Sequence, residues 1–336
     1  MAPTIAMEFV ASAVRAAVHS GIEQPAVLKM TGLTLEDITD RTKQVPLPQH
    51  IQLLETVAAI HQDECFGLRY GLNHHLSDFG VLGYVLLNSA TVGSALNQLI
   101  QYFEVWQQAT EVALTLDGDT AWFSYQITDA TIQTRKQDAE TAIAFSVASI
   151  RTLTRQHWCP KAVWLEHSPP RDTSEYERLL NAPVFFDQPV NAIAIERKLL
   201  EETIPLADRT LLPMLESHLQ TFMAQREVGN QLIASVCQTI AQSLPQGCIT
   251  LEKVAAGLGM SGRTLQRYLR DRNVTFKQLV NETRYRQAMM YLEESKLTLT
   301  EIAFVLGYSE LSAFNHAFKS WTGLTPRKYR QSALER

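Results

Sequence analysis

A pattern that occurs twice near the carboxyl end constrains the fold of this chain more than any other feature of its sequence. VAAGLGMSGRTLQRYLR at 254–270 resembles IAFVLGYSELSAFNHAFK at 302–319. Both copies place alanine after the first apolar residue, glycine after a leucine, and serine two positions beyond that glycine. The second copy carries one extra residue after the serine. The repetition indicates two copies of one small structural unit.

The chemistry of the backbone predicts what each copy folds into. The alanine suits a point at which a second helix passes close by. Gly259 and Gly307 can adopt the left-handed conformation that ends a helix. Ser261 and Ser309 can cap the next helix by accepting from its free N–H groups. Each copy is therefore predicted to be two short helices joined by a tight turn, a helix-turn-helix.

The second helix of each copy has an apolar and a polar face. Leu265 and Leu269 recur at the spacing of a buried helical stripe, and Phe314 and Phe318 repeat that spacing. The polar faces carry Arg263, Thr264, Gln266, Arg267, Arg270, Ser312, Asn315, His316 and Lys319. Arginine pairs well with guanine, and glutamine or asparagine with adenine, whereas lysine suits a phosphate. We predict that these faces bind double-stranded DNA; the alternative is that they are ordinary solvated helix surfaces.

The segment between the two copies, residues 275–294, is predicted to be one continuous helix. A helix of this length spans about 30 Å. Successive major grooves on one side of DNA lie about 34 Å apart. Such a spacer can place the second helix of each copy in neighbouring grooves of one duplex. We call these two second helices, which would contact the bases, the reading helices.

Charge is divided unevenly along the 336 residues. From Asn230 onward there are 14 Lys and Arg against 8 Asp and Glu, a balance of +6. The preceding part has 16 against 27, a balance of −11. A basic tail suits a polyanion, and an acidic front does not. The length and this division predict two domains with different partners.

Other features of the sequence indicate in which cellular compartment the protein is found. No apolar run approaches the roughly 18 residues of a membrane helix, and the first residues lack the basic start of a secretory signal. The cysteines Cys65, Cys159, Cys237 and Cys248 are scattered without a paired motif, which favours free thiols in a reducing compartment. We expect a cytoplasmic protein that is not attached to a membrane.

The front part of the chain mixes helices with strands. Helical patterns cover 5–19, 47–61, 91–106 (with Thr91 as a cap), 138–157, 175–181 and 205–226, where Pro213 is expected to kink the helix. Two β-rich runs around Asp117-Gly118 predict a hairpin. Residues 162–167 and 191–196 are predicted strands. This order indicates an α+β domain that ends near residue 200.

The carboxyl-terminal part, residues 230–333, resembles the AraC/XylS family of bacterial transcription regulators. The closing motif of that family is matched by Ile302, Ala303, Gly307, Tyr308, Ser312, Phe314, Phe318, Lys319, Trp321, Gly323, Thr325, Pro326, Tyr329 and Arg330. The resemblance implies an all-α DNA-binding domain with two helix-turn-helix motifs joined by a long helix. It also implies that certain positions face base edges: Arg263, Gln266, Arg267, Ser312, Asn315 and His316.

The front part resembles, more loosely, the arabinose-binding-like sensing and dimerisation domain of one branch of this family. The matching run is FGLRYGLNHHLSDFGVLGYVLLNSATVGSALNQLIQYF at 66–103. The resemblance implies an effector that is an amino acid, a fatty acid or another hydrophobic metabolite. Candidate pocket residues are Arg69, which can meet a carboxylate, and the aromatic residues Tyr70, Tyr84, Tyr102 and Trp106, with Phe66, Phe79, Phe103 and Trp122 as further candidates. Each aromatic residue can also be a plain part of the core.

Sequence signatures of catalysis are missing from the chain. It has no phosphate-binding glycine loop, no H-E-x-x-H and no G-x-S-x-G. His74-His75 is the tightest histidine pair, and we expect it in an exposed loop because chain neighbours point to different sides. We therefore expect neither an enzyme nor a cofactor or metal site.

Together these features predict a ligand-responsive, sequence-specific DNA-binding regulator. Residues 1–204 would bind the effector and dimerise, 205–229 would form a linker helix, and 230–336 would bind DNA. The resemblance to the family implies an activator. The expected partners are RNA polymerase and a second copy of the chain. Two alternatives remain: a DNA-binding regulator whose front domain only dimerises, and an enzyme with a recruited helical tail.

Overall fold

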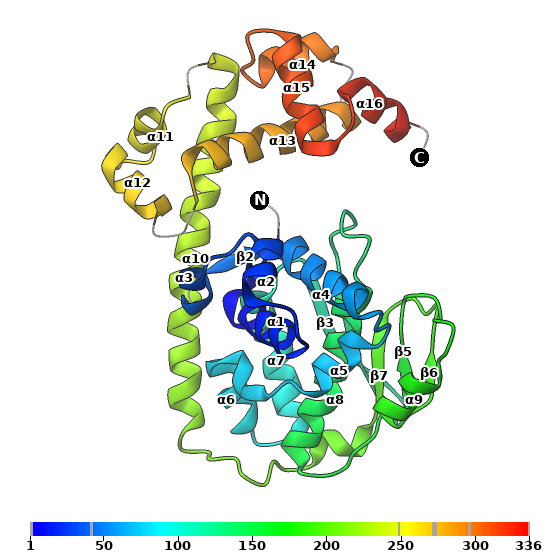
Figure 1. Cartoon of the computed structure of the whole chain (residues 1–336). Helices are drawn as coiled ribbons and strands as arrows, with labels where there is room; N and C mark the ends of the chain where they lie inside the picture. The colour runs from blue at the N-terminus through cyan, green and yellow to red at the C-terminus, as the bar shows by residue number, and fades with distance from the viewer. Residues whose placement is uncertain (1–2, 41–42, 248, 271–273, 295–296, 335–336) are drawn as a thin grey trace. The chain divides into compact units, whose positions relative to one another are not determined.

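The computed structural model describes residues 3–40, 43–247, 249–270, 274–294 and 297–334 of the chain (Figure 1). It divides into two compact units, Ala2–Met223 and Ala224–Arg336. The first unit combines helices with sheets, and the second is helical, as the sequence predicts. Each unit has hydrophobic clusters of its own.

The front unit contains a mixed sheet with the strand order β3-β4-β7-β5-β6. Its strands are β3 (Thr110–Asp117), β4 (Thr120–Ile127), β5 (Ala162–Trp164), β6 (Val184–Phe185) and β7 (Asn191–Glu196). All neighbours are antiparallel except β5 and β6, which are parallel. Gly118, with a φ of +56°, forms the turn between β3 and β4, so the predicted hairpin is confirmed.

Helices cover this sheet and surround it. They are α1 (Met7–His19), α2 (Gln24–Thr31), α3 (Leu35–Thr39), α4 (Leu47–His61), α5 (Phe66–Leu72), α6 (Val81–Leu87), α7 (Val92–Trp106), α8 (Lys136–Thr154) and α9 (Ser174–Leu180), with 3₁₀ turns η1 (Leu76–Phe79) and η2 (Arg197–Glu201). Thr91 accepts from the Ser94 amide at 3.1 Å and so caps α7, as predicted. Two short strands that the sequence analysis does not predict, β1 (Thr4–Ala6) and β2 (Gln44–Pro46), pair beside α1 and α4.

The core of the front unit lies between the sheet and the helices α7 and α8. Helix α8 contacts β4 and β7, and α7 contacts β3. Strand β4 alternates buried and half-buried residues, so its inner side chains Ala121, Phe123, Tyr125 and Ile127 point into the core. Helix α5 lies so close to α8 that a Cβ atom at Gly71 would come within 2.4 Å of the Thr141 carbonyl oxygen. This packing brings the beginning of α8 next to the centre of the unit.

The expected helix at 205–226 is wrong at both ends. Helix α10 begins at Leu212 and continues to Ser243. Pro213 lies in its first turn, where the missing N–H has no intrahelical partner to lose, so the proline starts the helix instead of kinking it. Before it, the Asp208 carboxylate accepts from the amides of Thr210 at 2.8 Å and Leu211 at 3.3 Å, which holds a turn.

The first turns of α10 pack against the core of the front unit. Leu212, Leu215, Leu219 and Met223 contact the hydrophobic cluster there, and Leu219 is fully buried. The side chain of Phe222, which the sequence places on the same stripe, lies outside the described residues. The first turns of α10 therefore pack on the front unit itself.

The second unit is built from the end of α10 and a series of shorter helices. They are η3 (Leu244–Gln246), α11 (Leu251–Gly257), α12 (Gly262–Arg270), α13 (Phe276–Glu294), α14 (Leu299–Val305), α15 (Leu311–Thr322) and α16 (Pro326–Leu334). Figure 1 shows α11 and α12 near one end of α13, and α14 and α15 near the other. The two predicted helix-turn-helix motifs and the long helix that joins them are thus present.

The turns of the two motifs follow the predicted backbone chemistry with one exception. Gly259 and Gly307 have φ values of +70° and +74°, the left-handed conformation. Ser261 accepts from the Thr264 amide at 3.1 Å and caps α12. Ser309 does not cap α15, because the extra residue of the second copy moves the N-cap position to Glu310, whose side chain makes no capping hydrogen bond.

Two general expectations can be compared with the described residues. Cys65, Cys159 and Cys237 are free thiols, while Cys248 lies outside the part of the chain that the structure describes. Among the described helices, none is both long and apolar enough to cross a membrane.

Gly307 provides a test of the second turn. A Cβ atom at this position would lie 2.5 Å from the Leu244 carbonyl oxygen, whereas Gly323, also at a φ of +74°, has open space around it. A left-handed alanine costs roughly 1–2 kcal/mol in either place. We expect Gly307→Ala to lower the free energy of unfolding of a 224–336 fragment by more than about 2 kcal/mol, because the backbone clash adds to this strain.

Urea unfolding of this fragment, followed by circular dichroism, measures the difference. Gly323→Ala is the matched control, with an expected loss of about 1 kcal/mol. Equal losses for the two variants would show that the contact with Leu244 is unimportant.

Candidate nucleic-acid interface and ligand cavity

Helix α12 presents the predicted polar face to solvent. Leu265 and Leu269 are buried in the helical core. Every side chain predicted to contact DNA from this helix is exposed: Arg263, Thr264, Gln266, Arg267 and Arg270. All of these except Thr264 line one groove along the helix. The Thr264 hydroxyl lies 2.8 Å from the Ser261 hydroxyl, so it takes part in the start of the helix.

Helix α15 has the same arrangement. Phe314 and Phe318 are fully buried, and their rings lie 5.8 Å apart. Ser312, His316 and Lys319 are exposed, and Asn315 is half-buried. The two polar faces therefore lie outside the core, on helices held by apolar residues on their inner faces.

Helix α13 holds the second motif through Arg284. The Arg284 guanidinium donates to the carbonyl oxygens of Leu306 at 3.0 Å and Gly307 at 3.3 Å. It also lies 4.5 Å from the centre of the Tyr308 ring, a cation–π contact. These contacts tie the turn of the second motif to the spacer helix. The spacer itself is capped at Thr275, which accepts from the Gln278 amide at 3.2 Å, and its 19 residues span about 28 Å.

Three residues near the end of the chain, Lys328, Tyr329 and Arg330, have polar groups that suit a phosphate, but two of them have partners within the protein. Arg330 donates to the carbonyl oxygens of Leu297 at 2.8 Å and Tyr291 at 3.4 Å. The ring of Tyr329 packs at 5.6 Å from that of Phe318. Lys328 is exposed. Of these three, Lys328 is the one whose position suits a phosphate.

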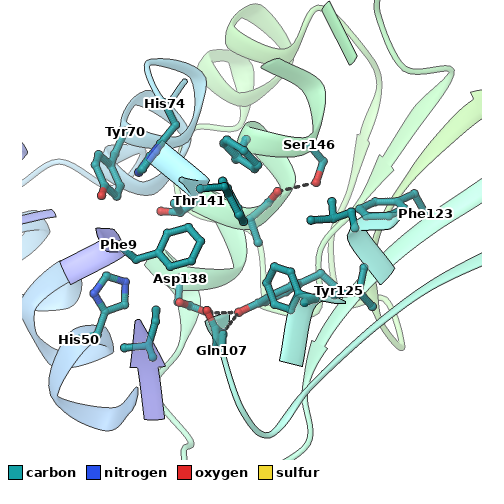
Figure 2. A pocket seen from close by; sticks show the side chains of 17 residues that line it. Phe9, His50, Tyr70, His74, Gln107, Phe123, Tyr125, Asp138, Thr141 and Ser146 are labelled. Atoms are coloured by element: carbon teal, nitrogen blue, oxygen red, sulfur yellow. Dashed lines mark hydrogen bonds between the residues drawn. The ribbon is translucent and has the colours of Figure 1, made fainter. Parts of the chain in front are cut away.

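The front unit contains a cavity of about 60 Å³ between its helices and the inner face of the sheet (Figure 2). Its walls are mainly aromatic and aliphatic, with a few polar groups. The lining residues are Ile5, Phe9, His50, Tyr70, His74, Phe79, Leu99, Phe103, Gln107, Val112, Phe123, Tyr125, Asp138, Thr141, Ala142, Phe145 and Ser146. A predominantly apolar cavity with few polar groups is typical of a ligand site.

A short chain of hydrogen bonds crosses one wall of the cavity. Gln107 donates to the Tyr125 hydroxyl at 2.5 Å, and this hydroxyl donates to the Asp138 carboxylate at 2.5 Å (Figure 2). Burial raises the pKa of Asp138 to about 6, although the bond from Tyr125 opposes the shift. Glu55 also raises this pKa through its negative charge. Asp138 lies in the first turn of α8, where the helix dipole favours a negative charge.

Further polar groups of the lining come from α4, from α5 and from His74 just after α5. Burial lowers the pKa of His50 to about 3, so its imidazole is neutral, and its Nδ1 has no hydrogen-bond partner. The hydroxyl of Tyr70 is also buried without a hydrogen-bond partner of good geometry. Burial raises the pKa of this hydroxyl well above its usual range, and the nearby Ser12 opposes the shift. His74 lies between Ser12 at 3.4 Å and Asp78 at 2.9 Å, and the contact with Asp78 is close but not aligned as a hydrogen bond.

The residues proposed for an effector pocket are scattered. Tyr70 lines the cavity. Arg69 forms ion pairs with Asp63 at 2.5 Å and with Glu175, and it does not line the cavity. Tyr84 is half-exposed on α6, whereas Tyr102 and Trp106 are buried in the core cluster beyond the cavity lining.

Of the further aromatic candidates, Phe79 and Phe103 line the cavity, and Phe66 and Trp122 do not. Trp122 instead stacks on Trp164, with ring centres 4.1 Å apart. The expectation of an exposed His74-His75 pair is wrong for His74, which is buried, while His75 is exposed. The two side chains do point to different sides.

The polar groups that sequence reasoning missed are His50, Gln107, Tyr125 and Asp138. They come from α4, the end of α7, β4 and α8. No local motif links them, because the fold alone brings these segments together. A weak signal was available for Tyr125, since the alternation of β4 places it on the buried face.

Family models match both the front and the carboxyl-terminal parts of the chain. Residues 21–204 match the family model described as the arabinose-binding domain of AraC transcription regulators, N-terminal part, which covers more than half of the chain. Residues 254–332 match a helix-turn-helix domain model. The second match contains both motifs and the spacer between them.

Similar curated proteins match over most of the chain. The ornithine utilization regulator of Pseudomonas aeruginosa is 29% identical over 84% of this chain and 83% of its own length. The transcriptional regulator VirS of Mycobacterium tuberculosis is 28% identical over 83% of this chain and 82% of its own. Among solved structures, the regulator CdpR of Pseudomonas aeruginosa is 23% identical and covers 91% of this chain and 96% of its own, with a TM-score of 0.46.

The raised pKa of Asp138 predicts a pH dependence of stability. Between about pH 4 and pH 6 the native carboxyl keeps its proton while the unfolded one has lost it, so the native state binds more protons. The free energy of unfolding therefore falls as the pH rises through this window, by up to about 3 kcal/mol. We expect Asp138→Asn to abolish this part of the dependence and to raise stability at pH 7.

Urea unfolding of the parent and the variant at several pH values measures the effect. Asp78 is the matched control, because its close contact with the His74 ring, at 2.9 Å, lowers its pKa to about 2. The ionised Asp78 adds to the free energy of unfolding at pH 7, and this stabilisation is lost as the pH falls below about 4. We therefore expect Asp78→Asn to change the acidic side of the stability profile, below about pH 4. Parallel profiles for the parent and Asp138→Asn between pH 4 and pH 6 would contradict the assignment.

Proposed function

Since this chain belongs to the AraC family of transcription regulators, we propose that a small molecule bound in its front unit controls its sequence-specific binding to DNA. One observation carries the DNA-binding part. Arg263, Gln266 and Arg267 are exposed on one face of α12, and the opposite face of that helix is buried. In this proposal the exposed faces of α12 and α15 enter successive major grooves, with α13 as the spacer.

The proposed division of labour follows the two units. Residues 1–204 bind the effector and form a homodimer, 205–229 connect the parts, and 230–336 bind a promoter or operator. The cavity beside Asp138 supports the sensing role, because it is largely apolar and carries buried polar atoms without partners. The function requires no catalysis and no cofactor, and a DNA-binding regulator acts in the cytoplasm.

The proposed mechanism is a shift between two arrangements of the dimer. The effector must bind one arrangement more tightly than the other, because equal affinity shifts nothing. The favoured arrangement presents the two DNA-binding domains to paired half-sites and leads to activation through contact with RNA polymerase. Selection of bound fragments from genomic DNA identifies the operator.

A regulator without a ligand is the competing function, with a front unit that only dimerises. A thermal-shift screen of residues 1–225 with amino acids, fatty acids and other hydrophobic metabolites separates the two. A hit that also changes operator binding by the full chain supports the sensor. A screen without any hit supports the competing function.

Replacement of Arg267 tests the assignment of the first reading helix. We expect Arg267→Ala to weaken binding to the selected operator by about 1–3 kcal/mol and to relax the preference at one base pair. Fluorescence anisotropy with the operator and with single-base variants measures both effects.

Lys319→Ala is the matched control on the second helix. A lost phosphate contact should weaken binding to all sequences alike and reduce the salt dependence by about one ion. If Arg267→Ala binds every sequence as the parent does, α12 does not read the base sequence.

A further inference from the structure

The cavity of the front unit has an unusual electrostatic composition. Asp138 lines it and is 4% exposed. Within the described part of the chain, no lysine or arginine lines the cavity. The other polar groups are neutral or already paired, since the imidazole of His50 is uncharged and His74 lies against Asp78. The carboxylate therefore has no cation beside it inside the cavity.

The walls around this carboxylate are rich in aromatic rings. Phe9 and Phe79 meet edge to face with ring centres 4.4 Å apart, and Phe79 stacks on Phe145 at 4.6 Å. Phe103 meets Tyr125 edge to face at 6.1 Å. Figure 2 shows Phe9 among the polar groups His50, Tyr70 and Asp138, around one shared space. Ring faces attract organic cations, and a nearby carboxylate adds to that attraction.

We propose that this cavity binds the ammonium group of a small amine, with Asp138 as its counter-ion and the aromatic rings around its carbon atoms. The inference rests on the proposed sensing function and specifies the chemical class of the effector. An ammonium group has three donors, and the Nδ1 of His50 and the Tyr70 oxygen are buried acceptors without partners in the same cavity. A bound amine would place a positive charge beside Asp138, where no lysine or arginine lines the described cavity.

The same geometry disfavours a carboxylate as the group that enters the cavity. A second negative charge would meet Asp138 with no cation between them, and Glu55 adds to the negative field at this site. Arg135 has a charge that lowers the pKa of Asp138, but it lies outside the cavity lining. Arg135 is occupied by the Ile127 carbonyl oxygen at 3.0 Å and by Glu166 at 3.3 Å.

The size of the cavity limits the bound group. A volume of about 60 Å³ is smaller than the cavity of about 150 Å³ that holds a benzene ring in an engineered protein. It admits a head group of a few heavy atoms as it stands. A longer amine would leave its chain between the helices or open the wall.

Matched compounds of equal shape test the charge preference in the full chain. n-Butylamine, butan-1-ol and butanoate form one set, and phenethylamine, 2-phenylethanol and phenylacetate form another. We expect isothermal titration and thermal shift at neutral pH to give binding in the order amine, alcohol, carboxylate, with no binding for the carboxylates. Carboxylates that bind as well as the amines, or amines that do not bind at all, would overturn the inference.

Variants then place the site. Asp138→Asn should weaken amine binding by roughly tenfold to a hundredfold, which corresponds to the loss of one charged hydrogen bond. Asp117→Asn, which removes an exposed carboxylate of the β3–β4 hairpin, should leave it unchanged. Ala142→Leu should fill the cavity and abolish amine binding with the charge of Asp138 retained. Unchanged amine affinity in a folded Asp138→Asn or Ala142→Leu chain would show that the amine binds elsewhere.

The outcomes separate this inference from the sensing function. If a carboxylate or a neutral metabolite, but no amine, binds the front unit and changes operator binding, the regulator is a sensor of another class. If no compound changes operator binding by a chain that binds DNA normally, the sensing function itself is absent.

Discussion

The burial of one apolar stripe on each reading helix is the interaction on which the DNA-binding unit depends. Helices α12 and α15 have 9 and 12 residues, and helices of that length are marginal in water on their own. They persist because Leu265 and Leu269, or Phe314 and Phe318, are buried, each contributing about 1.5–3 kcal/mol. The same burial fixes the rotation of each helix about its axis. Stability and the presentation of the polar face therefore have one cause.

Several basic residues of the tail serve the fold. Arg284 ties the second motif to the spacer, and Arg330 ties α16 to the end of that spacer through carbonyl oxygens. Their guanidinium groups donate to backbone carbonyl oxygens near helix ends. The net positive charge of the tail thus overstates the number of cations that can meet phosphate. The DNA contacts that we propose are therefore the exposed residues on the outer faces of α12 and α15.

The proposed sensing role of the front unit depends on one buried carboxylate. A buried carboxylate without a lysine or arginine beside it destabilises the folded chain. The Asp138 carboxylate is held in place by a hydrogen bond from the Tyr125 hydroxyl, which accepts a hydrogen bond from Gln107. A compound that supplies the missing charge would stabilise one arrangement of the unit over another. The position of Asp138 at the start of α8 connects such a change to a helix that contacts the sheet and α5.

The sequence by itself determined the features that depend on neighbours along the chain. The helical stripes, the glycine turns, the Thr91 cap and the β3–β4 hairpin each follow from the spacing of a few residues, and the structure confirms them. The roles predicted from the sequence for Ser309 and Pro213 were wrong. A shift of one or two residues at the start of a helix changes the role of such a residue. Only the tertiary structure decided which groups share the cavity, because its lining comes from residues as far apart as Ile5 and Ser146. Such groups meet through packing between distant segments, and packing leaves no periodic trace in the chain.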